Sequence, residues 1–525
     1  MVSVRLLPMG ERAFLLEAGS LDEVLALHSG LEAERPTGVL DLVPAARTVL
    51  VRIDPVVLPV PAARAWAQAA AAKAERTPPT STAAVELDIA YDGADLAETA
   101  GLLGLTADEL VRRHSAAEWT VAFTGFAPGF GYLVSEDWPY DVPRLSSPRT
   151  RVPAGVVGLA ARFSGAYPRE TPGGWRLIGT TDARLFDADA ATPALLAPGA
   201  RVRFTPVRAL AVTSSATAPA SVPPVSTAPS PAATPSAGIE IIDPGLLATL
   251  QDLGRPGAAS LGVAVSGALD RGALRTANRL LGNPEDATGV EVTMGGFRAV
   301  AAVDAWFAVT GAWGPVRLAG REVDPYAAHE WPAGAELHLD WFQHGARAYL
   351  AARGGFDARP ALGSRATDLL AGIGPAALRA GDAVGLRAEA SVPIPVAPLA
   401  PWGAPHDDEL VVELAPGPRA DWFGSPALGM LYEAVWTVSN DADRVGMRLD
   451  GPELVRARTD ELPSEGMVPG ALQVPPSGRP TILLADGPVT GGYPVIAVVT
   501  DAALDLLAQA RPGTRIRFRH ARTNG

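Results

Sequence analysis

The chemically suggestive side chains of the first half are gathered in one glycine-rich aromatic segment. It runs from His114 to Leu133 and reads HSAAEWTVAFTGFAPGFGYL. Glycines and a proline between aromatic rings make a stiff loop whose backbone can approach a ligand closely. Because imidazole titrates near neutral pH, His114 is our candidate for a general acid or base; a hydrogen-bonded core histidine is the alternative.

Arginines spaced by prolines come after this loop in PRLSSPRTRVPAG, and SGAYPRETPGGW comes next. Guanidinium groups bind carboxylates and phosphates through paired hydrogen bonds. We therefore predict a cleft for a small anionic molecule, with Arg144 and Arg149 as anion ligands. The other predicted binding residues of this half are Phe126, Pro128, Gly129, Phe130, Tyr132, Gly173, Gly174 and Trp175. The alternative is that glycines and prolines only shape barrel corners while the arginines are solvated.

Polar residues recur in glycine-rich motifs of the second half: QDLGRPG, SGALDRGALRTAN, GSRATD, LPSEGMVPGALQVPPSG and ADGPVTGGYP. Such motifs fit a pocket better than a core, so Asp270, Glu465 and Asp486 are predicted catalytic residues. Asp270 stands near a helix N-terminus, where capping is the commoner role. Arg365 and Asp368 are candidates for an ion pair. The predicted binding residues are Gln251, Asp252, Arg255, Ser266, Asn278, Arg365, Asp368, Gln473, Thr490, Gly491, Gly492 and Tyr493. Hydrogen-bonded structural supports are the alternative.

Two reactive residue types are almost missing. The chain has no cysteine, which excludes a thiol nucleophile, a disulfide and a thiolate metal site. Its single lysine, Lys73, lies in an alanine-rich stretch, so the sequence offers no Walker A loop, no pyridoxal phosphate lysine and no covalent biotin. The histidines show no metal-binding spacing, and we expect no metal site. Arginine remains as the anion-binding residue.

The composition indicates a folded acidic protein. Its 525 residues include 44 Lys+Arg and 57 Asp+Glu, a net charge of −13, with 48% hydrophobic and 19% charged residues. An acidic chain is a poor general surface for nucleic acid. No apolar run reaches the roughly 20 residues of a membrane helix. We therefore expect a cytoplasmic protein that binds neither nucleic acid nor a membrane.

Composition and periodicity divide the chain into five parts. Residues 1–84 predict a small α/β domain with an antiparallel sheet, its strands in VSVRLLP, AFLLEAG, VLDLVP and TVLVRID and its helices in SLDEVLALHSGLEAER and PAARAWAQAAAAKAER. Short strands between glycines and prolines predict β-barrels at 85–208, 238–389 and 390–525. The uncharged Pro/Ala/Ser/Thr stretch 209–237 is typical of a linker.

An internal repeat favours the barrels. GGWRLIGTTDARLF followed by LLAPGARVRF in the first half is similar to GGYPVIAVVTDAALDLL followed by ARPGTRIRF in the second. Each copy predicts an apolar strand, a helix starting at Thr-Asp-Ala, a Pro-Gly turn and a closing strand. RAGDAVGL at 379–386 is a fainter third copy. Chance similarity between hairpins is the alternative.

The motifs carry two family resemblances. Residues 1–207 resemble the family of B-type 5-oxoprolinase subunits, also called allophanate hydrolase subunit 1 or kinase-inhibitor-like, through the histidine before GFAPGFGYL and through VPAG, TPGGW and LIGTT. Ala127 and Gly131 depart from that family's loop. Residues 239–520 resemble the family of C-type 5-oxoprolinase subunits, also called allophanate hydrolase subunit 2 or biotin-dependent carboxyltransferase-like, through IIDPGLLATLQDLGRPG, NDADRVGMRLDGPEL and ADGPVTGGYP. The chain looks like a fusion of two subunits.

The resemblance implies a mainly β fold with an α/β part: a small N-terminal α/β domain, then cyclophilin-like β-barrels, one in the first half and two in the second. It also implies the B and C components of an ATP-dependent 5-oxoprolinase, which opens 5-oxo-L-proline to L-glutamate with a separate A-type subunit. ATP with Mg is expected for the complex. Two other functions stay open: the acceptor carboxyltransferase module of a urea carboxylase-like system, and a non-enzymatic histidine-kinase-inhibitor-like regulator. A homo-oligomer also stays open.

Overall fold

The chain folds into two compact units, which are described separately. The structure is a computed structural model that describes residues 4–74, 84–208, 238–388, 392–395, 403–406 and 408–522. Unit 1 comprises Met1–Pro78, Gly125–Pro128 and Ala237–Gly525, and unit 2 comprises Pro79–Thr124 and Gly129–Ser236. The predicted linker 209–237 lies outside the described residues. Strands predominate over helices, so the predicted mainly β fold with an α/β part is confirmed.

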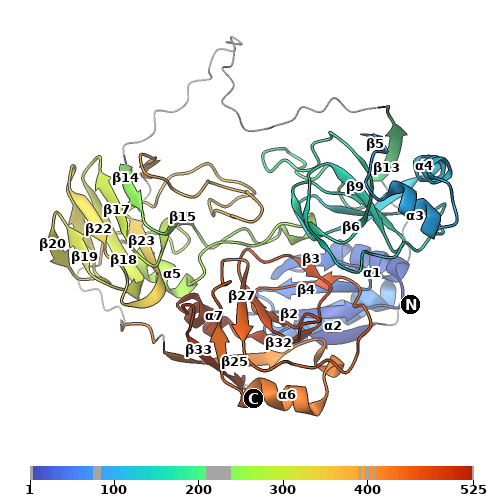
Figure 1. Cartoon of the computed structure of the whole chain (residues 1–525). Helices are drawn as coiled ribbons and strands as arrows, with labels where there is room; N and C mark the ends of the chain where they lie inside the picture. The colour runs from blue at the N-terminus through green and yellow to red at the C-terminus, as the bar shows by residue number, and fades with distance from the viewer. Residues whose placement is uncertain are drawn as a thin grey trace, which may run out of the picture. The chain divides into compact units, whose positions relative to one another are not determined.

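Unit 1 begins with the predicted α/β domain (Figure 1). Its elements are β1 (Arg5–Pro8), β2 (Ala13–Glu17), α1 (Leu21–Ala33), β3 (Val39–Pro44), β4 (Thr48–Ile53) and α2 (Val60–Lys73). The antiparallel sheet has the order β1-β2-β4-β3. The Ser20 hydroxyl accepts a hydrogen bond from the Glu23 backbone nitrogen and so caps α1. The elements predicted here from the sequence are confirmed.

Both faces of this sheet are buried. On one face Leu16 and Val51 pack in a cluster with the apolar residues of α1 and α2. On the other face Leu15 and Leu50 pack with apolar residues of the C-terminal barrel, including Val498. Local periodicity did not reveal this second contact, but the apolar run VLV in β4 carries its signal, because a strand buried on one face only would alternate.

A β-sandwich comes next in unit 1. Its elements are β14 (Gly238–Pro244), β15 (Leu247–Gln251), η1 (Ala259–Leu261), α5 (Arg271–Leu280), β16 (Gly289–Thr293), β17 (Phe297–Ala301), β18 (Ala305–Trp313), β19 (Val316–Leu318), β20 (Arg321–Val323), β21 (His329–Trp331), β22 (Glu336–Leu339), β23 (His344–Ala352) and β24 (Ala383–Gly385). One sheet has the order β20-β19-β22-β17-β14-β24 and the other β15-β16-β23-β18-β21. Both contribute to one core, which includes Phe297, Phe307 and Trp331.

The last part of unit 1 is a closed barrel. Its elements are β25 (Glu409–Pro416), η2 (Ala420–Trp422), α6 (Ser425–Glu433), β26 (Trp436–Val438), β27 (Gly446–Asp450), β28 (Glu465–Gly466), β29 (Ala471–Gln473), β30 (Thr481–Leu483), β31 (Thr490–Gly491), β32 (Val495–Val499), α7 (Asp501–Ala508) and β33 (Arg515–His520). The barrel order is β25-β32-β29-β30-β27-β26-β33. It closes because β33 pairs in parallel with β25.

Unit 2 is a nearly closed barrel. Its elements are β5 (Ala84–Ile89), α3 (Leu96–Leu102), α4 (Ala107–Ala116), β6 (Trp119–Thr124), β7 (Gly131–Val134), β8 (Arg149–Val152), β9 (Val156–Ala160), β10 (Phe163–Ala166), β11 (Thr171–Gly173), β12 (Arg176–Thr180) and β13 (Arg201–Pro206). The main sheet has the order β12-β9-β10-β7-β6-β13-β5. Ala90 and Thr180 exchange backbone hydrogen bonds of 2.9 and 2.8 Å between its two end strands.

The closing strands predicted from the internal repeat are confirmed, whereas one of the two helices predicted from it is wrong. The final strands β13 and β33 each pair in parallel with the first strand of their barrel. α7 starts at Asp501 as predicted, whereas no helix begins after Thr181 in the first copy. The two copies differ in the residues after this start: ALDLLA sustains a helix, while RLFDADAATP brings aspartates and Pro193.

Candidate functional site

Four polar motifs of the second half meet in one cluster, which we call the motif cluster: Gln251, Asp252, Arg255, Ser266, Thr367, Asp368 and Asp486. All seven residues are at least nine-tenths buried. The Ser266 hydroxyl donates to Asp486 Oδ1 at 2.5 Å and lies 3.2 Å from the Thr367 carbonyl oxygen. Gln251 Nε2 donates to the same carbonyl at 3.0 Å. The residues predicted from separate motifs therefore lie together.

Asp252 fixes the loops of this cluster. Its Oδ1 accepts hydrogen bonds from the Gly254 backbone nitrogen and the Ser364 hydroxyl, both at 2.7 Å. Its Oδ2 accepts from the Arg365 backbone nitrogen at 2.6 Å. Asp252 is thus a positioning residue that joins the QDLGRPG and GSRATD loops.

The predicted ion pair between Arg365 and Asp368 is wrong. Arg365 Nε donates to the Ala358 carbonyl at 2.9 Å and lies 3.8 Å from Asp357 Oδ1. Asp368 Oδ1 instead accepts from the Ala371 backbone nitrogen at 2.8 Å. The turn after Asp368 draws its carboxylate inward, while the Arg365 side chain lies along the preceding loop.

Several buried polar atoms of the motif cluster lack a hydrogen-bond partner among the described residues. They are Arg255 Nε and Nη1, Gln251 Oε1, Thr367 Oγ1 and Asp368 Oδ2. A buried polar atom without a partner destabilises a protein by about 1–3 kcal/mol. Five such atoms on neighbouring residues indicate a place where a polar ligand or ordered water completes the hydrogen bonding.

The electrostatics of the cluster favour proton transfer at Asp368. Burial and the nearby Asp486 raise the pKa of Asp368 to about 6. Burial lowers the pKa of Arg255, against the attraction of Asp368 and Asp252. A carboxyl group that titrates near neutrality beside a guanidinium with free N–H groups is suited to acid–base chemistry on a bound anion.

Two residues that hold the cluster in place were missed at the sequence level, Arg444 and Glu291. Arg444 donates from Nε to Asp486 Oδ2 at 2.9 Å, from Nη2 to Asp486 Oδ1 at 3.0 Å and from Nη1 to Glu291 Oε1 at 2.6 Å. Glu291 Oε2 accepts from the Tyr349 hydroxyl at 2.7 Å. The available signal for Glu291 was a carboxylate inside the apolar strand GVEVT.

Asp270 adjoins this network as a helix cap. Its Oδ1 accepts from the Ala273 backbone nitrogen at 2.8 Å at the start of α5, and its Oδ2 accepts from Gln509 Nε2 at 2.7 Å. Burial, then the nearby Asp505, raises its pKa to about 7. The capping role is thus present, and the catalytic role stays a prediction. Asn278, farther along α5, donates to the Ala287 carbonyl at 2.8 Å.

A second group of predicted residues lies against the N-terminal domain. Glu465 is 2% exposed and accepts from Arg419 Nε at 3.0 Å, while Arg419 Nη2 also donates to Glu17 Oε1 at 2.6 Å. The Thr490 hydroxyl accepts from the Phe126 backbone nitrogen at 2.8 Å. These contacts stabilise the packing of domains within unit 1. The other predicted residues here are Pro128, Gln473, Gly491, Gly492 and Tyr493, the last of which is exposed.

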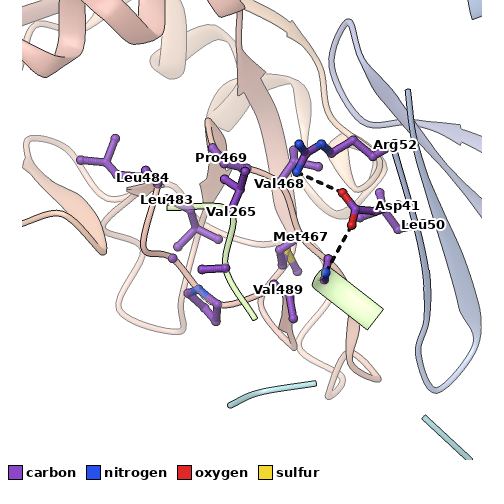
Figure 2. A pocket seen from close by; sticks show the side chains of 15 residues that line it. Asp41, Leu50, Arg52, Val265, Met467, Val468, Pro469, Leu483, Leu484 and Val489 are labelled. Carbon is purple, nitrogen blue, oxygen red and sulfur yellow. Dashed lines mark hydrogen bonds and ion pairs between the residues drawn. The ribbon is translucent and has the colours of Figure 1, made fainter. Parts of the chain in front are cut away.

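A narrow cavity of about 20 Å³ lies beside this group (Figure 2). Asp41 lies at its edge, 3.2 Å from Arg52 Nη1 and hydrogen bonded to the Ala259 backbone nitrogen at 3.2 Å. Much of the remaining lining is apolar, including Met467 and Val489. The volume holds about one water molecule, so this cavity is too small for a substrate.

In unit 2, His114 is fully buried among aromatic rings. Its Nδ1 lies 2.8 Å from the Tyr91 hydroxyl and its Nε2 lies 2.9 Å from the Ser164 hydroxyl. The rings of Trp119 and Phe204 pack against it. Burial lowers the pKa of His114 to about 3, so the imidazole is neutral at physiological pH. These surroundings match the core-histidine interpretation, and the catalytic role stays a prediction.

The predicted loop residues of unit 2 form an aromatic cluster of Phe130, Tyr132, Tyr167 and Trp175, with ring centroids 5.1–5.5 Å apart. At its edge Arg149 Nη2 donates to Asp95 Oδ1 at 2.6 Å. Gly173 lies so close to Tyr167 that a Cβ would fall 2.5 Å from its hydroxyl. The other predicted residues of this region are Gly129, Arg144 and Gly174. Their role in binding an anion stays a prediction.

The described part of the chain shows neither a cluster of three metal-binding side chains nor a helix long and apolar enough to cross a membrane.

The chain matches two family models that together span most of it. Residues 261–520 match subdomains A and B of the carboxyltransferase domain, and residues 4–196 match subdomains C and D. Over 97% of its length and 99% of the other chain, it superimposes on the crystal structure of TTHA0988 with a TM-score of 0.82 and 35% identity.

Named relatives match the two halves separately. The chain is 37% identical to the C-type 5-oxoprolinase subunit of Escherichia coli K12 over 53% of this chain and 90% of that protein. It is 46% identical to the B-type 5-oxoprolinase subunit of Escherichia coli O157:H7 over 23% of this chain and 57% of that protein. It is also 31% identical to urea amidolyase of Saccharomyces cerevisiae, over 53% of this chain and 16% of that protein.

Proposed function

Because the chain belongs to the carboxyltransferase-domain family that includes the C-type 5-oxoprolinase subunits, with a half similar to the B-type subunits fused ahead of it, we propose that it supplies the B and C components of an ATP-dependent 5-oxoprolinase. The complex would open 5-oxo-L-proline to L-glutamate with a separate A-type subunit. The observation that carries this proposal is the buried motif cluster, which lies within the half that is similar to the C-type subunit along 90% of that protein.

Opening a lactam requires a site that holds the carboxylate, polarises the amide oxygen and delivers water. Arg255 offers two buried N–H groups without partners among the described residues, which suit a carboxylate or a developing oxyanion. Asp368 is our candidate to accept or donate a proton, because its pKa is raised to about 6. Asp486 is a positioning residue, held by Ser266 and Arg444.

ATP with its magnesium ion would supply the free energy that opening a stable lactam needs, and the sequence offers no Walker A loop to hold it. The proposal therefore includes the A-type subunit as an obligatory partner. A cytoplasmic location fits an ATP-consuming reaction.

The test is a reconstitution. The full chain, alone and with an A-type subunit, receives 5-oxo-L-proline and ATP, and glutamate and ADP are measured. We expect equal amounts of both products only with the partner, and loss of at least about 90% of turnover in Asp368→Asn. The matched control is Asp441→Asn, an exposed aspartate paired with Arg448, which should leave turnover unchanged. Absence of glutamate in every combination would contradict the proposal.

A second candidate is the acceptor half of a carboxyltransferase. It is favoured by the two carboxyltransferase family models and by the similarity to urea amidolyase. The single lysine provides no biotin attachment motif, so carboxybiotin would have to come from another protein. Carboxyl transfer from free carboxybiotin to urea, in the absence of 5-oxoproline turnover, would favour this candidate.

A further inference from the structure

Unit 1 contains a second, larger cavity whose lining is rich in arginine. Its volume is about 190 Å³, and it is lined by residues of the N-terminal domain, α5, α7 and the closed barrel. Charged side chains in the lining are Arg12, Arg271, Arg275, Asp501 and Asp505. None of these residues belongs to the predicted site.

The arginines of this cavity are incompletely paired. Arg12 pairs with Asp501. The Arg271 guanidinium makes no hydrogen bond or ion pair with the residues that the structure describes. The buried Arg275 Nε has no hydrogen-bond partner there either, and the carboxylate of Glu285 lies 3.5 Å away. The Arg271 guanidinium therefore retains donors that can face a ligand, and Arg275 adds a second positive charge whose ion pair with Glu285 is 3.5 Å long.

The acidic residues of the lining do not satisfy these donors. Asp505 accepts hydrogen bonds from the backbone nitrogens of Arg271 and Gly272 at 3.0 and 3.2 Å, so its carboxylate caps the start of α5. Among the charged side chains of the lining, three arginines face two aspartates. The lining residues therefore carry a formal net charge of +1.

Charge repulsion adds to this imbalance. The pKa of Arg271 is lowered to about 10, mainly by burial and also by the nearby positive charges of Arg52, Arg12 and Arg275. The negative charge of Asp505 raises this pKa but does not cancel the effect of the three arginines. The guanidinium still carries its charge at neutral pH. A bound anion would relieve the repulsion among these arginines.

The size of the cavity limits the ligand. A volume of 190 Å³ corresponds to about six water molecules. Pockets for drug-sized molecules start at roughly 300 Å³. Inorganic phosphate or a small carboxylic acid therefore fits within the cavity, whereas a nucleotide would extend beyond it.

We propose that this arginine-lined cavity is a binding site for a small oxyanion, a phosphate or the carboxylate of a small acid, with Arg271 and Arg275 as its principal ligands. The cavity lining includes Ala485, which immediately precedes Asp486 of the motif cluster, and Leu269, which immediately precedes the helix cap Asp270. The proposal needs no turnover; only the choice of 5-oxoproline as one probe rests on the proposed function.

Calorimetric titration of the full chain without any partner tests the proposal. The probes are inorganic phosphate, 5-oxo-L-proline and 2-pyrrolidone, the same lactam without the carboxylate. We expect phosphate or 5-oxoproline to bind and 2-pyrrolidone not to bind. Binding of phosphate alone would identify the ligand as a phosphate, and binding of 5-oxoproline alone would identify it as a carboxylate. Failure of both anions at millimolar concentration, or equal binding of 2-pyrrolidone, overturns the proposal.

Variants locate the binding. Arg271→Gln and Arg275→Gln should each weaken the anion by about tenfold or more, because each removes a charged donor. The matched control Arg298→Gln, at a half-exposed arginine on β17, should bind like the wild type. Unchanged affinity in both cavity variants overturns the assignment. Thermal unfolding of each variant, measured without anion, checks that the variant is folded. If Arg271→Gln does not fold, the affinity of Arg275→Gln tests the assignment.

Discussion

Arg444 of the closed barrel donates a 2.6 Å hydrogen bond to Glu291 on β16 of the sandwich, 153 residues away in the chain. The same guanidinium donates two more hydrogen bonds to Asp486 and one to the Gly267 carbonyl at 2.7 Å. All three side chains are at least 97% buried. One arginine thus forms ion pairs with carboxylates from both the sandwich and the closed barrel.

Removing this arginine should strongly destabilise the protein. Arg444→Met leaves Asp486 buried without its ion-pair partner and leaves Glu291 with only the more distant Arg347, 3.8 Å away, which we expect to lower the free energy of unfolding by about 3–5 kcal/mol. Urea denaturation measures it. The matched control is Arg448→Met on β27, whose ion pair with Asp441 is exposed and should contribute less than about 1 kcal/mol. Equal effects of the two substitutions would contradict the role of Arg444.

The pKa of Asp368 predicts a pH-dependent stability difference. Because the folded-state pKa of this carboxyl is raised to about 6, the folded state binds more protons than the unfolded state between about pH 4 and pH 6, and stability falls as pH rises through that window. Asp368→Asn removes the titrating carboxyl and therefore this loss of stability. The free energy of unfolding of the variant, measured by urea denaturation relative to that of the wild type, should rise by about 2 kcal/mol from about pH 4.5 to about pH 7.5. A difference independent of pH would show that the pKa is not raised.

Ser266 combines a left-handed backbone with a buried side-chain hydrogen bond. Its φ is +54°, and its hydroxyl donates to Asp486. Ser266→Ala loses the hydrogen bond and keeps the strained backbone, whereas Ser266→Gly loses the hydrogen bond and relieves the strain. We expect the glycine variant to be more stable than the alanine variant by about 1 kcal/mol, with both less active than the wild type. Thermal unfolding and the reconstituted assay give the two readouts, and the reverse order of stability would show that the backbone is unstrained.

His114 predicts acid sensitivity of unit 2. Its folded-state pKa is lowered to about 3, so the unfolded state binds more protons between about pH 3 and pH 6.5, and stability falls as pH drops through that window. Hydrogen-exchange mass spectrometry of peptides from β6 and β10 should show faster exchange at about pH 4.5 than at pH 7.5, after correction for intrinsic rates. In His114→Gln the difference should shrink. A turnover profile with an inflection that disappears in this variant would instead favour a catalytic His114.

Local signals in the sequence were sufficient for local structure. The Ser20 cap, the strands of the N-terminal domain and the cap at Asp270 all depend on residues within a few positions of one another. The repeat correctly marked the closing strands β13 and β33. Its helix after Thr181 failed because three matching residues do not sustain a helix when the residues after them oppose it.

Long-range partners could not be predicted from the sequence. The motifs identified Gln251, Ser266, Asp368 and Asp486 as site candidates, but not that they share one cluster. Nothing near Arg444 in the sequence indicates that its partner is Glu291, because no periodicity relates residues 153 positions apart. The false pair of Arg365 with Asp368 has the same origin: proximity in sequence was a poor guide to where two side chains point.

The parallel pairing of the first and last strands in two barrels has an evolutionary consequence. In unit 2 β5 lies beside β13, and in the closed barrel β25 lies beside β33, so each module begins and ends at neighbouring positions. A module with adjacent ends can be cut out, joined to another chain or inserted into a loop without rethreading its strands. Carrying such modules on one polypeptide or on separate chains then changes only how the modules are tethered, and not how each module folds.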